Sequence, residues 1–443
     1  MKKIYSILSL LTALNLMGQS YFDNFLDHEL KKEVLLNEED GLDVPIDIDF
    51  VNRIGRTNEL WILNQSNYNG GSFTIMPDVA DTTLELINIY DSHNGHFMIY
   101  PSAVAMGENG NFATVQYVKN TAADATSTFM GPSLWSAGED TFGVINQSDW
   151  ASNEPLGSHM DMLHQSPFST GLAYEEANVY WVNDGWNGNI VRYDFADDHG
   201  PGGEYHADGI LARYPEVETE RVDDVASHMI LDEGKKWLYI VDSGNKRVIR
   251  LDITSGERGN TLSAPNESLA DYYEMTNTTS EEIISEGLDQ PAGIELVDNR
   301  LFVSDKALGK IFMYDIDNNF ELLGEIVVGE GVQGIKIGLD KSLYYVNSDD
   351  ETLTRLTPIF LSSVDEYNES KLVIYPSLNT NGILNISYDK IIEEVVIYDV
   401  LGKRVMSIED LSNMSITLEV SELNQGIYFV QVNGVKPKRI QIL

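Results

Sequence analysis

The amino-acid sequence predicts an all-β fold made of repeated modules, and three observations support this. Short aromatic and β-branched strands recur at nearly constant spacing between residues 40 and 357. A sustained 3.6-residue helical pattern is missing. Each strand-turn-strand module cannot bury both faces alone, so the modules must stack radially or along an axis. Six copies predict a six-bladed β-propeller, and a different strand pattern after it predicts a small C-terminal β-sandwich.

The composition restricts the possible partners of the chain. Its 443 residues suit one large domain of repeats with small additions. Seventy Asp and Glu against 29 Lys and Arg give a formal charge of −41, which repels phosphate backbones and anionic lipids. Nucleic acid and membrane surfaces are therefore poor candidate partners. The chain has no cysteine, which excludes disulfides, thiolate zinc sites and cysteine nucleophiles.

The N-terminus has the layout of a signal peptide. Lys2 and Lys3 precede an apolar run over residues 4–17, which ends in small and polar residues at 18–20. The run is too short for a membrane-spanning helix, and no later segment approaches the length that a bilayer requires. We expect residues 1–19 to be a signal peptide, with a buried N-terminal helix as the alternative, and a secreted or cell-surface protein.

The repeated unit begins with a turn-like triplet that leads into an apolar strand. A second strand, rich in aromatic residues, ends in Asp or Asn, and in three copies another Asp follows ten positions later. The triplets are residues 101–103, 169–171, 227–229, 291–293 and 332–334, and the Asp pairs are Asp184 and Asp194, Asp242 and Asp252, and Asp305 and Asp315.

One copy of the unit carries a family resemblance. Residues 237–252, WLYIVDSGNKRVIRLD, resemble an NHL repeat, the unit of six-bladed propellers. The resemblance extends over residues 40–357, where long insertions separate the copies. It implies a central channel, surrounded by the leading triplets of the blades.

The pattern changes after Pro358. Residues 358–371 contain the polar stretch SSVDEYNES, which is suited to a linker. Residues 372–443 then contain six short strands separated by Asn-Gly, Leu-Gly-Lys and Asn-Gln-Gly turns, which is the rhythm of a compact sandwich.

This last segment resembles the C-terminal sorting domain of the type IX secretion system. The matching stretches are LVIYP at 372–376, Asn381-Gly382, VIYD at 396–399, Gly402-Lys403, and Leu423 with GIY at 426–428. The family usually has a second proline where this chain has Leu378. The resemblance implies passage across the outer membrane by the type IX machinery; an independent sugar-binding sandwich is the alternative.

Histidines give the clearest chemical signal, because five of the eight lie between residues 159 and 228. His159, Asp161 and His164 lie close together, and His228 occupies the middle of a leading triplet, where it would face the channel. Imidazole and carboxylate ligands predict a divalent metal, zinc or copper, at these four residues.

A second group consists of His199 and His206 in a Gly-rich loop with Asp197, Asp198 and Asp208. Calcium is disfavoured there because the regular EF-hand spacing is absent. Hydrogen-bonded loop histidines and Asp/Gly turns are the alternative to a metal at both groups.

Among enzymes with this repeat, the chain resembles the peptidyl-hydroxyglycine amidating lyases. That resemblance implies a channel zinc held by three histidines, of which only His228 matches in placement. No GxSxG, HExxH, Walker or dinucleotide motif appears.

Two functions stay open on these grounds. The first is an exported propeller that binds an unknown extracellular ligand and has a His-lined metal site in the channel. The second is a metal-dependent lyase or hydrolase. Trp135, Trp181 and Trp186 are either sugar- or peptide-stacking residues or core residues.

Overall fold

The structure is a computed structural model that describes residues 20–443 except 52, 54, 67–69, 109, 121–128, 149–154, 204, 206, 266, 361–371, 377, 380–381, 401, 410, 434 and 436. The predicted signal peptide and most of the predicted linker therefore lie outside the described residues. The chain divides into two compact units, with the boundary between Phe360 and Leu361. Each unit is described by itself.

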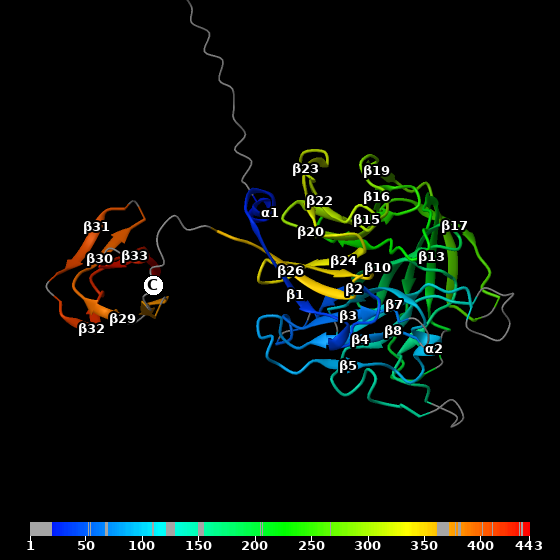
Figure 1. The fold of residues 1–443 in the computed structure, drawn as a ribbon, viewed down its shortest axis with the longest axis horizontal. Helices are drawn as coiled ribbons and strands as arrows, with labels where there is room; N and C mark the ends of the chain where they lie inside the picture. Colours follow the sequence, from blue (N-terminus) through cyan, green and yellow to red (C-terminus); the bar gives the residue numbers. More distant parts are fainter. Residues whose placement is uncertain are drawn as a thin grey trace, which may run out of the picture. The chain divides into compact units, whose positions relative to one another are not determined.

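The first unit consists of six sheets, which are antiparallel apart from one added parallel pair, and this confirms the predicted six blades (Figure 1). The innermost strands contact one another in a closed ring, in the order β2, β6, β10, β14, β20 and β24. The first blade has strands β2 (Pro45–Phe50), β3 (Leu60–Asn64), β4 (Ser72–Met76) and β5 (Ile87–Ile89), and the second has β6 (Pro101–Met106), β7 (Asn111–Gln116), β8 (Ser133–Ser136) and β9 (Asp161–Met162). The third blade is built on β10 (Gly171–Glu176), β11 (Val179–Asp184), β12 (Asn189–Asp194) and β13 (Ile210–Glu218), and the fourth has β14 (Met229–Asp232), β15 (Trp237–Asp242), β16 (Arg247–Asp252) and β19 (Ser280–Ile284). The fifth blade has β20 (Pro291–Val297), β21 (Arg300–Asp305), β22 (Lys310–Asp315) and β23 (Glu321–Val327), and the sixth has β24 (Val332–Ile337), β25 (Leu343–Asn347) and β26 (Thr352–Pro358) with β1 (Leu30–Leu36).

The sixth blade is completed by the N-terminal part of the chain. Strand β1 pairs antiparallel with β26, from Leu30 opposite Pro358 to Leu36 opposite Leu353, and Figure 1 shows the two side by side in blue and yellow. This strand precedes residue 40, where we expected the repeats to begin. The ring is thus closed by joining the two ends of the repeat region within one sheet.

The third blade is widened by an insertion from the fourth. Between β16 and β19 the chain forms a hairpin of β17 (Glu257–Thr261) and β18 (Asp271–Thr276). Strand β18 pairs parallel with β13, so the third sheet has six strands. The insertion brings Glu267 to the connection between the second and third blades, where its carboxylate accepts a hydrogen bond from the His164 amide at 3.0 Å.

The Asp that ends the second strand of the third, fourth and fifth blades has a structural role. Asp184 is buried, and its Oδ1 accepts hydrogen bonds from the amides of Trp186 and Asn187 in the next turn. Asp305 accepts from the amides of Leu308 and Asp289. These carboxylates accept hydrogen bonds from turn amides and so fix the backbone of the turns.

Aromatic residues fill the space between blades. Trp61, Phe73, Phe112, Trp135 and Phe142 are all buried in one cluster between the first two blades. Their rings meet mostly edge to face, for example Phe73 and Phe112 with centroids 5.6 Å apart. The strand residues that the sequence marked as apolar are therefore core residues of adjacent blades.

Helical structure in the described residues is limited to short pieces, as predicted. They are η1 (Tyr21–Asp23), α1 (Asn24–Asp27), η2 (Glu38–Asp40) and α2 (Asn94–Phe97). None of the helices in this part of the chain has the length and apolar character that crossing a membrane requires.

The second unit is a two-sheet sandwich, as predicted. One sheet has the order β27-β29-β32 and the other β28-β34-β33-β30-β31. They enclose a separate core that includes Leu384, Ile397 and Val430. The strands are β27 (Val373–Tyr375), β28 (Leu378–Asn379), β29 (Ile383–Ile392), β30 (Val395–Asp399), β31 (Arg404–Ile408), β32 (Asn413–Glu419), β33 (Gly426–Val432) and β34 (Lys438–Ile442).

Candidate functional site

The leading triplets narrow one end of the propeller channel. The His228 imidazole donates from Nε2 to the Ser102 carbonyl at 3.0 Å, which links the fourth blade to the second. The Ala226 amide donates to Oε1 of Gln333 at 3.1 Å, which links the fourth blade to the sixth. Because these blades are not neighbours in the ring, the two bonds reach across part of the channel and narrow it at this level.

Glycine at the third position of the triplet makes this close approach possible. A Cβ on Gly171 would lie 1.9 Å from the Ser227 carbonyl oxygen, and one on Gly293 would lie 2.3 Å from the Gln333 carbonyl oxygen. A real Cβ cannot occupy either position. The glycines of these triplets are therefore required by packing between the innermost strands.

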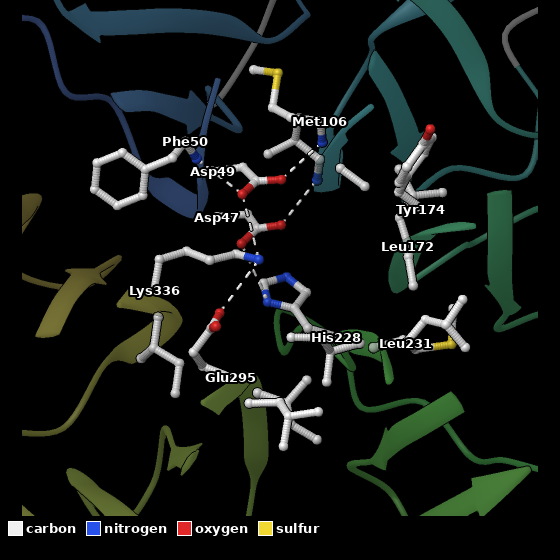
Figure 2. Close-up of a pocket in the computed structure, with 18 of the residues that line it drawn as sticks. Asp47, Asp49, Phe50, Met106, Leu172, Tyr174, His228, Leu231, Glu295 and Lys336 are labelled. Atoms are coloured by element: carbon white, nitrogen blue, oxygen red, sulfur yellow. Dashed lines mark hydrogen bonds and ion pairs between the residues drawn. The ribbon is translucent and has the colours of Figure 1, made fainter. Parts of the chain in front are cut away.

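Beyond this narrow end the channel widens into a cavity of about 500 Å³. All six innermost strands contribute to its wall. Its apolar lining includes Phe50, Met106, Leu172 and Leu231 (Figure 2). A cavity of this size suits a small molecule.

Two aspartates on β2 join the first blade to the second. Asp47 Oδ2 accepts a hydrogen bond from the Val104 amide at 2.9 Å, and Asp49 Oδ2 accepts one from the Met106 amide at 2.8 Å. Their other carboxylate oxygens accept from the amides of Ile48 and Phe50. Burial raises the pKa of Asp47 above its usual range, against the opposing influence of His228.

A lysine and a glutamate face each other across the innermost strands. Lys336 on β24 lies 3.4 Å from both Asp49 Oδ1 and Glu295 Oε2, and Figure 2 shows its ammonium group between the carboxylates. Burial alone would disfavour the ammonium form, but the carboxylates of Asp49, Glu295 and Asp47 outweigh it and raise the pKa of Lys336 above its usual range.

Glu295 on β20 is a strongly perturbed carboxyl group of the cavity. Burial raises its pKa to about 7, although Lys336 opposes the shift. Oε2 of Glu295 is buried and lacks a hydrogen-bond partner among the described residues. Near neutral pH this group can therefore both donate and accept a proton.

His228 lies in the cavity wall, as its triplet position predicted. Its Nδ1 lies 3.4 Å from Asp47 Oδ1, and its Nε2 donates to the Ser102 carbonyl. Both ring nitrogens thus face oxygen atoms of the protein. Binding of a metal ion by His228 would require one of these contacts to be given up.

The other two predicted channel histidines lie elsewhere. His159 is buried, with its Nδ1 2.7 Å from the Leu156 carbonyl and its ring stacked on Phe97. His164 is buried, with its Nδ1 3.1 Å from Glu267 Oε2. Neither lines the cavity that contains His228.

A different group of potential metal ligands emerges from the structure. Asp161, His199 and Asp208 offer ligand atoms that lie within 4.8 Å of one another, and within the described ranges no other such group of three is found. His199 Nε2 lies 3.0 Å from both oxygens of Asp208. His206 lies outside the described residues.

Our sequence analysis missed Asp47, Asp49, Glu295 and Lys336. A signal for two of them is present, because Glu295 and Lys336 each lie two positions after the glycine of a leading triplet. The corresponding positions in other blades are apolar, namely Ala105, Ala173 and Leu231. A charged residue two positions after the third residue of a triplet therefore indicates a side chain that points into the channel.

Comparison with known proteins identifies the second unit. Residues 373–442 match the family described as secretion system C-terminal sorting domain. No curated protein matches the chain.

Several solved structures are similar to the chain at low identity. One is an auxiliary nutrient binding protein from Bacteroides ovatus, with 13% identity and a TM-score of 0.46 over 75% of this chain and 78% of that one. Another is a calcium-binding protein, regucalcin, from Agrobacterium tumefaciens, with 11% identity and a TM-score of 0.44 over 74% and 94%. A third is a streptogramin B lyase, with 12% identity and a TM-score of 0.43 over 74% and 98%.

The fold and the family match lead to one conclusion about the chain. Six blades arranged around a closed ring of inner strands form its first unit, and the matched family covers almost all of the described second unit. The chain is a six-bladed β-propeller followed by a secretion system C-terminal sorting domain of the type IX kind, which indicates export to the cell surface or secretion.

Proposed function

We propose that the exported propeller binds a small polar ligand in its central cavity, and that Glu295 and Lys336 recognise it. The observation that supports this most is the buried Glu295 and the partly buried Lys336 in the cavity wall, whose charged groups lie 3.4 Å apart. Burying charges costs free energy unless they are well paired, so such groups concentrate at functional sites.

The pairing of these two groups leaves room for a ligand. Separations of 3.4 Å from Lys336 to Asp49 and to Glu295 are longer than the usual charge-assisted hydrogen bond of about 2.7–2.9 Å. A ligand that donates to Glu295 and accepts from Lys336 would make shorter bonds to both. The apolar wall at Leu172 and Leu231 would bury its carbon skeleton.

Acid–base catalysis at Glu295 is the second candidate function. A pKa of about 7 suits a group that must both accept and donate a proton near neutral pH. Binding requires only the paired charges and the apolar wall, whereas catalysis would also require a nucleophile or an oxyanion site beside Glu295, so binding is the better-supported function.

A ligand screen with matched variants tests the cavity. The probes are glycine, L-lysine, putrescine, glycerol and D-glucose, and the measurement is the thermal unfolding temperature. A ligand that binds only the folded state raises this temperature, by an amount equivalent to about 2.7 kcal/mol when present at 100 times its Kd. We expect at least one probe to stabilise the wild type and to lose this effect in Glu295→Gln and Lys336→Met.

Glu325→Gln is the matched control for this screen. Glu325 also pairs with a lysine, Lys310 at 2.8 Å, but on the outer strands of the fifth blade. It should respond to the probes as the wild type does. Equal stabilisation of all variants, or of none, would contradict the proposed site.

We also propose a divalent metal at Asp161, His199 and Asp208. One imidazole nitrogen and two carboxylates form a donor set that suits zinc. The ion would join the loop after β12 to β9, and its role would be to stabilise that loop. This group differs from the predicted set of His159, Asp161, His164 and His228, which stays a prediction.

Metal analysis of the purified protein tests both sets. If the proposed group binds the ion, Asp208→Asn should lower the zinc content and His228→Ala should leave it unchanged. The opposite result would favour the channel set. A protein without stoichiometric metal after incubation with zinc would refute both.

A further inference from the structure

A second hollow lies on the third blade, around a tryptophan in the turn between β11 and β12. Trp186 is 48% exposed, whereas Trp61, Trp135 and Trp181 are almost fully buried. Together with residues of the loop after β13 it lines a groove of about 430 Å³. The structure thus separates the three tryptophans considered for stacking: Trp135 and Trp181 are core residues, and Trp186 is at the surface.

The turn that carries Trp186 is held rigidly. Asp184 Oδ1 accepts hydrogen bonds from the amides of Trp186 and Asn187, both at 3.0 Å. The other oxygen of Asp184 pairs with the buried Arg213 at 2.7 Å. The Trp186 amide also donates to the Pro167 carbonyl at 3.1 Å. An exposed aromatic side chain on a fixed backbone loses little entropy when it binds a ligand.

Further aromatic and cationic groups support the tryptophan. Phe168 stacks on Trp186 with a centroid distance of 6.0 Å and an interplanar angle of 23°. Arg221 lies over the Phe168 ring at 4.5 Å, and Tyr117 meets Phe168 edge to face. Lys119 lies 5.1 Å from the Trp186 centroid. Trp186 is the aromatic side chain that lines the groove, and Phe168, which contacts Tyr117, packs against it.

The rim of the groove has polar groups of both signs. Arg221 contributes a guanidinium group, which donates to Asp223 at 2.6 Å, and Glu220 contributes a second carboxylate. Asn187 adds a side-chain amide. An anionic ligand would meet these carboxylates, and a cationic ligand would meet Arg221. A neutral ligand with many hydroxyl groups can use both donors and acceptors.

We propose that this groove binds a neutral saccharide, with one sugar ring stacked on Trp186. A pyranose ring has a flat C–H face, which packs on an aromatic ring, and a rim of hydroxyls that both donate and accept hydrogen bonds. That combination matches the exposed Trp186 ring and the mixed polar rim. The site is separate from the central cavity and does not depend on its function.

Binding of four neutral oligosaccharides to the full-length protein tests the proposal. The probes are maltohexaose, cellohexaose, xylohexaose and chitohexaose, and the measurements are isothermal titration calorimetry and tryptophan fluorescence. We expect at least one probe to bind and to change the fluorescence. Trp186→Ala should weaken its affinity at least tenfold, whereas Trp186→Phe should retain part of it, because a smaller aromatic face remains.

Leu308→Ala provides the matched control. Leu308 is exposed in the corresponding turn of the fifth blade, between β21 and β22, so its removal should leave the affinity unchanged. Circular dichroism establishes that each variant is folded.

Two results would overturn the proposal. One is the absence of binding by all four probes up to millimolar concentration, and the other is equal binding by the wild type and Trp186→Ala. Binding of a proline-rich peptide at Trp186 in place of the saccharides would likewise reject it in favour of a peptide site.

Discussion

Glu295 should make the stability of the propeller fall as the pH rises from about 4.5 to 7. Its pKa is about 7 in the folded protein against an ordinary value of 4.5. Between these values the folded state keeps a proton that the unfolded state releases, so the free energy of unfolding decreases with pH and then levels off. The full difference corresponds to roughly 3 kcal/mol.

Urea denaturation of the wild type and Glu295→Gln at about pH 5 and pH 7.5 measures this effect. Because glutamine does not titrate, the wild type should lose stability relative to the variant at the higher pH. Parallel pH profiles would show that Glu295 keeps an ordinary pKa in the folded protein.

Gly171 should tolerate no side chain. In Gly171→Ala the Cβ would meet the Ser227 carbonyl at 1.9 Å, and a backbone atom cannot move aside as a flexible side chain can. We expect the free energy of unfolding to decrease by about 3 kcal/mol. Gly234→Ala is the control, since its Cβ would meet only the Asp232 side chain at 3.4 Å. Equal stability of the two variants would rule out the tight packing of the inner strands.

At the scale of residues, the sequence predicted the position of a side chain where that position follows from the neighbouring residues in the chain. His228 was placed in the channel because its triplet begins an inner strand, and the structure confirms this position. The roles of His159 and His164 depend on distant partners, such as Glu267 from an insertion in the fourth blade. Sequence proximity to Asp161 therefore gave no information about those partners.

At the scale of elements, the sequence predicted the strands of the regular blades, but not the strand pairings that close the ring and widen the third blade. In the third, fourth and fifth blades the second strand ends in Asp and another Asp follows ten positions later, so the order of their strands could be read along the chain. The pairing of β1 with β26, and of β18 with β13, joins segments far apart in the sequence. No local pattern specifies such a pairing, because it depends on which sheet edge is available.

The N-terminal segment should contribute strongly to the stability of the ring. Phe25 is buried against Phe302 of the fifth blade, with ring centroids 6.2 Å apart, and Asp23 pairs with Arg300 at 2.6 Å. Replacing Phe25 by Ala should lower the free energy of unfolding by about 3–5 kcal/mol, because it leaves a cavity between blades.

Val34→Ala is the control within the same segment. Val34 lies on β1 and is largely exposed, so its truncation should change the stability by about 0.5 kcal/mol or less. Chemical denaturation compares the two variants. A small effect of Phe25→Ala would mean that the ring is stable without this anchor.

At the scale of the whole molecule, removal of residues 373–443 should leave a folded propeller that does not reach the cell surface. The hydrophobic core of the second unit draws only on residues from Leu372 onward, and the clusters between the blades draw on none of them. The propeller therefore keeps its complete core, and its thermal unfolding should be unchanged. The matched sorting family, in contrast, lies within the deleted segment.

Cell fractionation in a host with a type IX secretion system measures the effect on export. The full-length protein should appear at the surface or in the medium, and the truncated protein should accumulate in the periplasm. A periplasmic reporter fused to residues 361–443 is the converse control, since the sorting domain alone should direct it outward. Because folding and export are assigned to separate units, the two readouts are independent. Efficient export of the truncated protein would refute the sorting role, whereas a lowered unfolding temperature would instead refute the independence of the two cores.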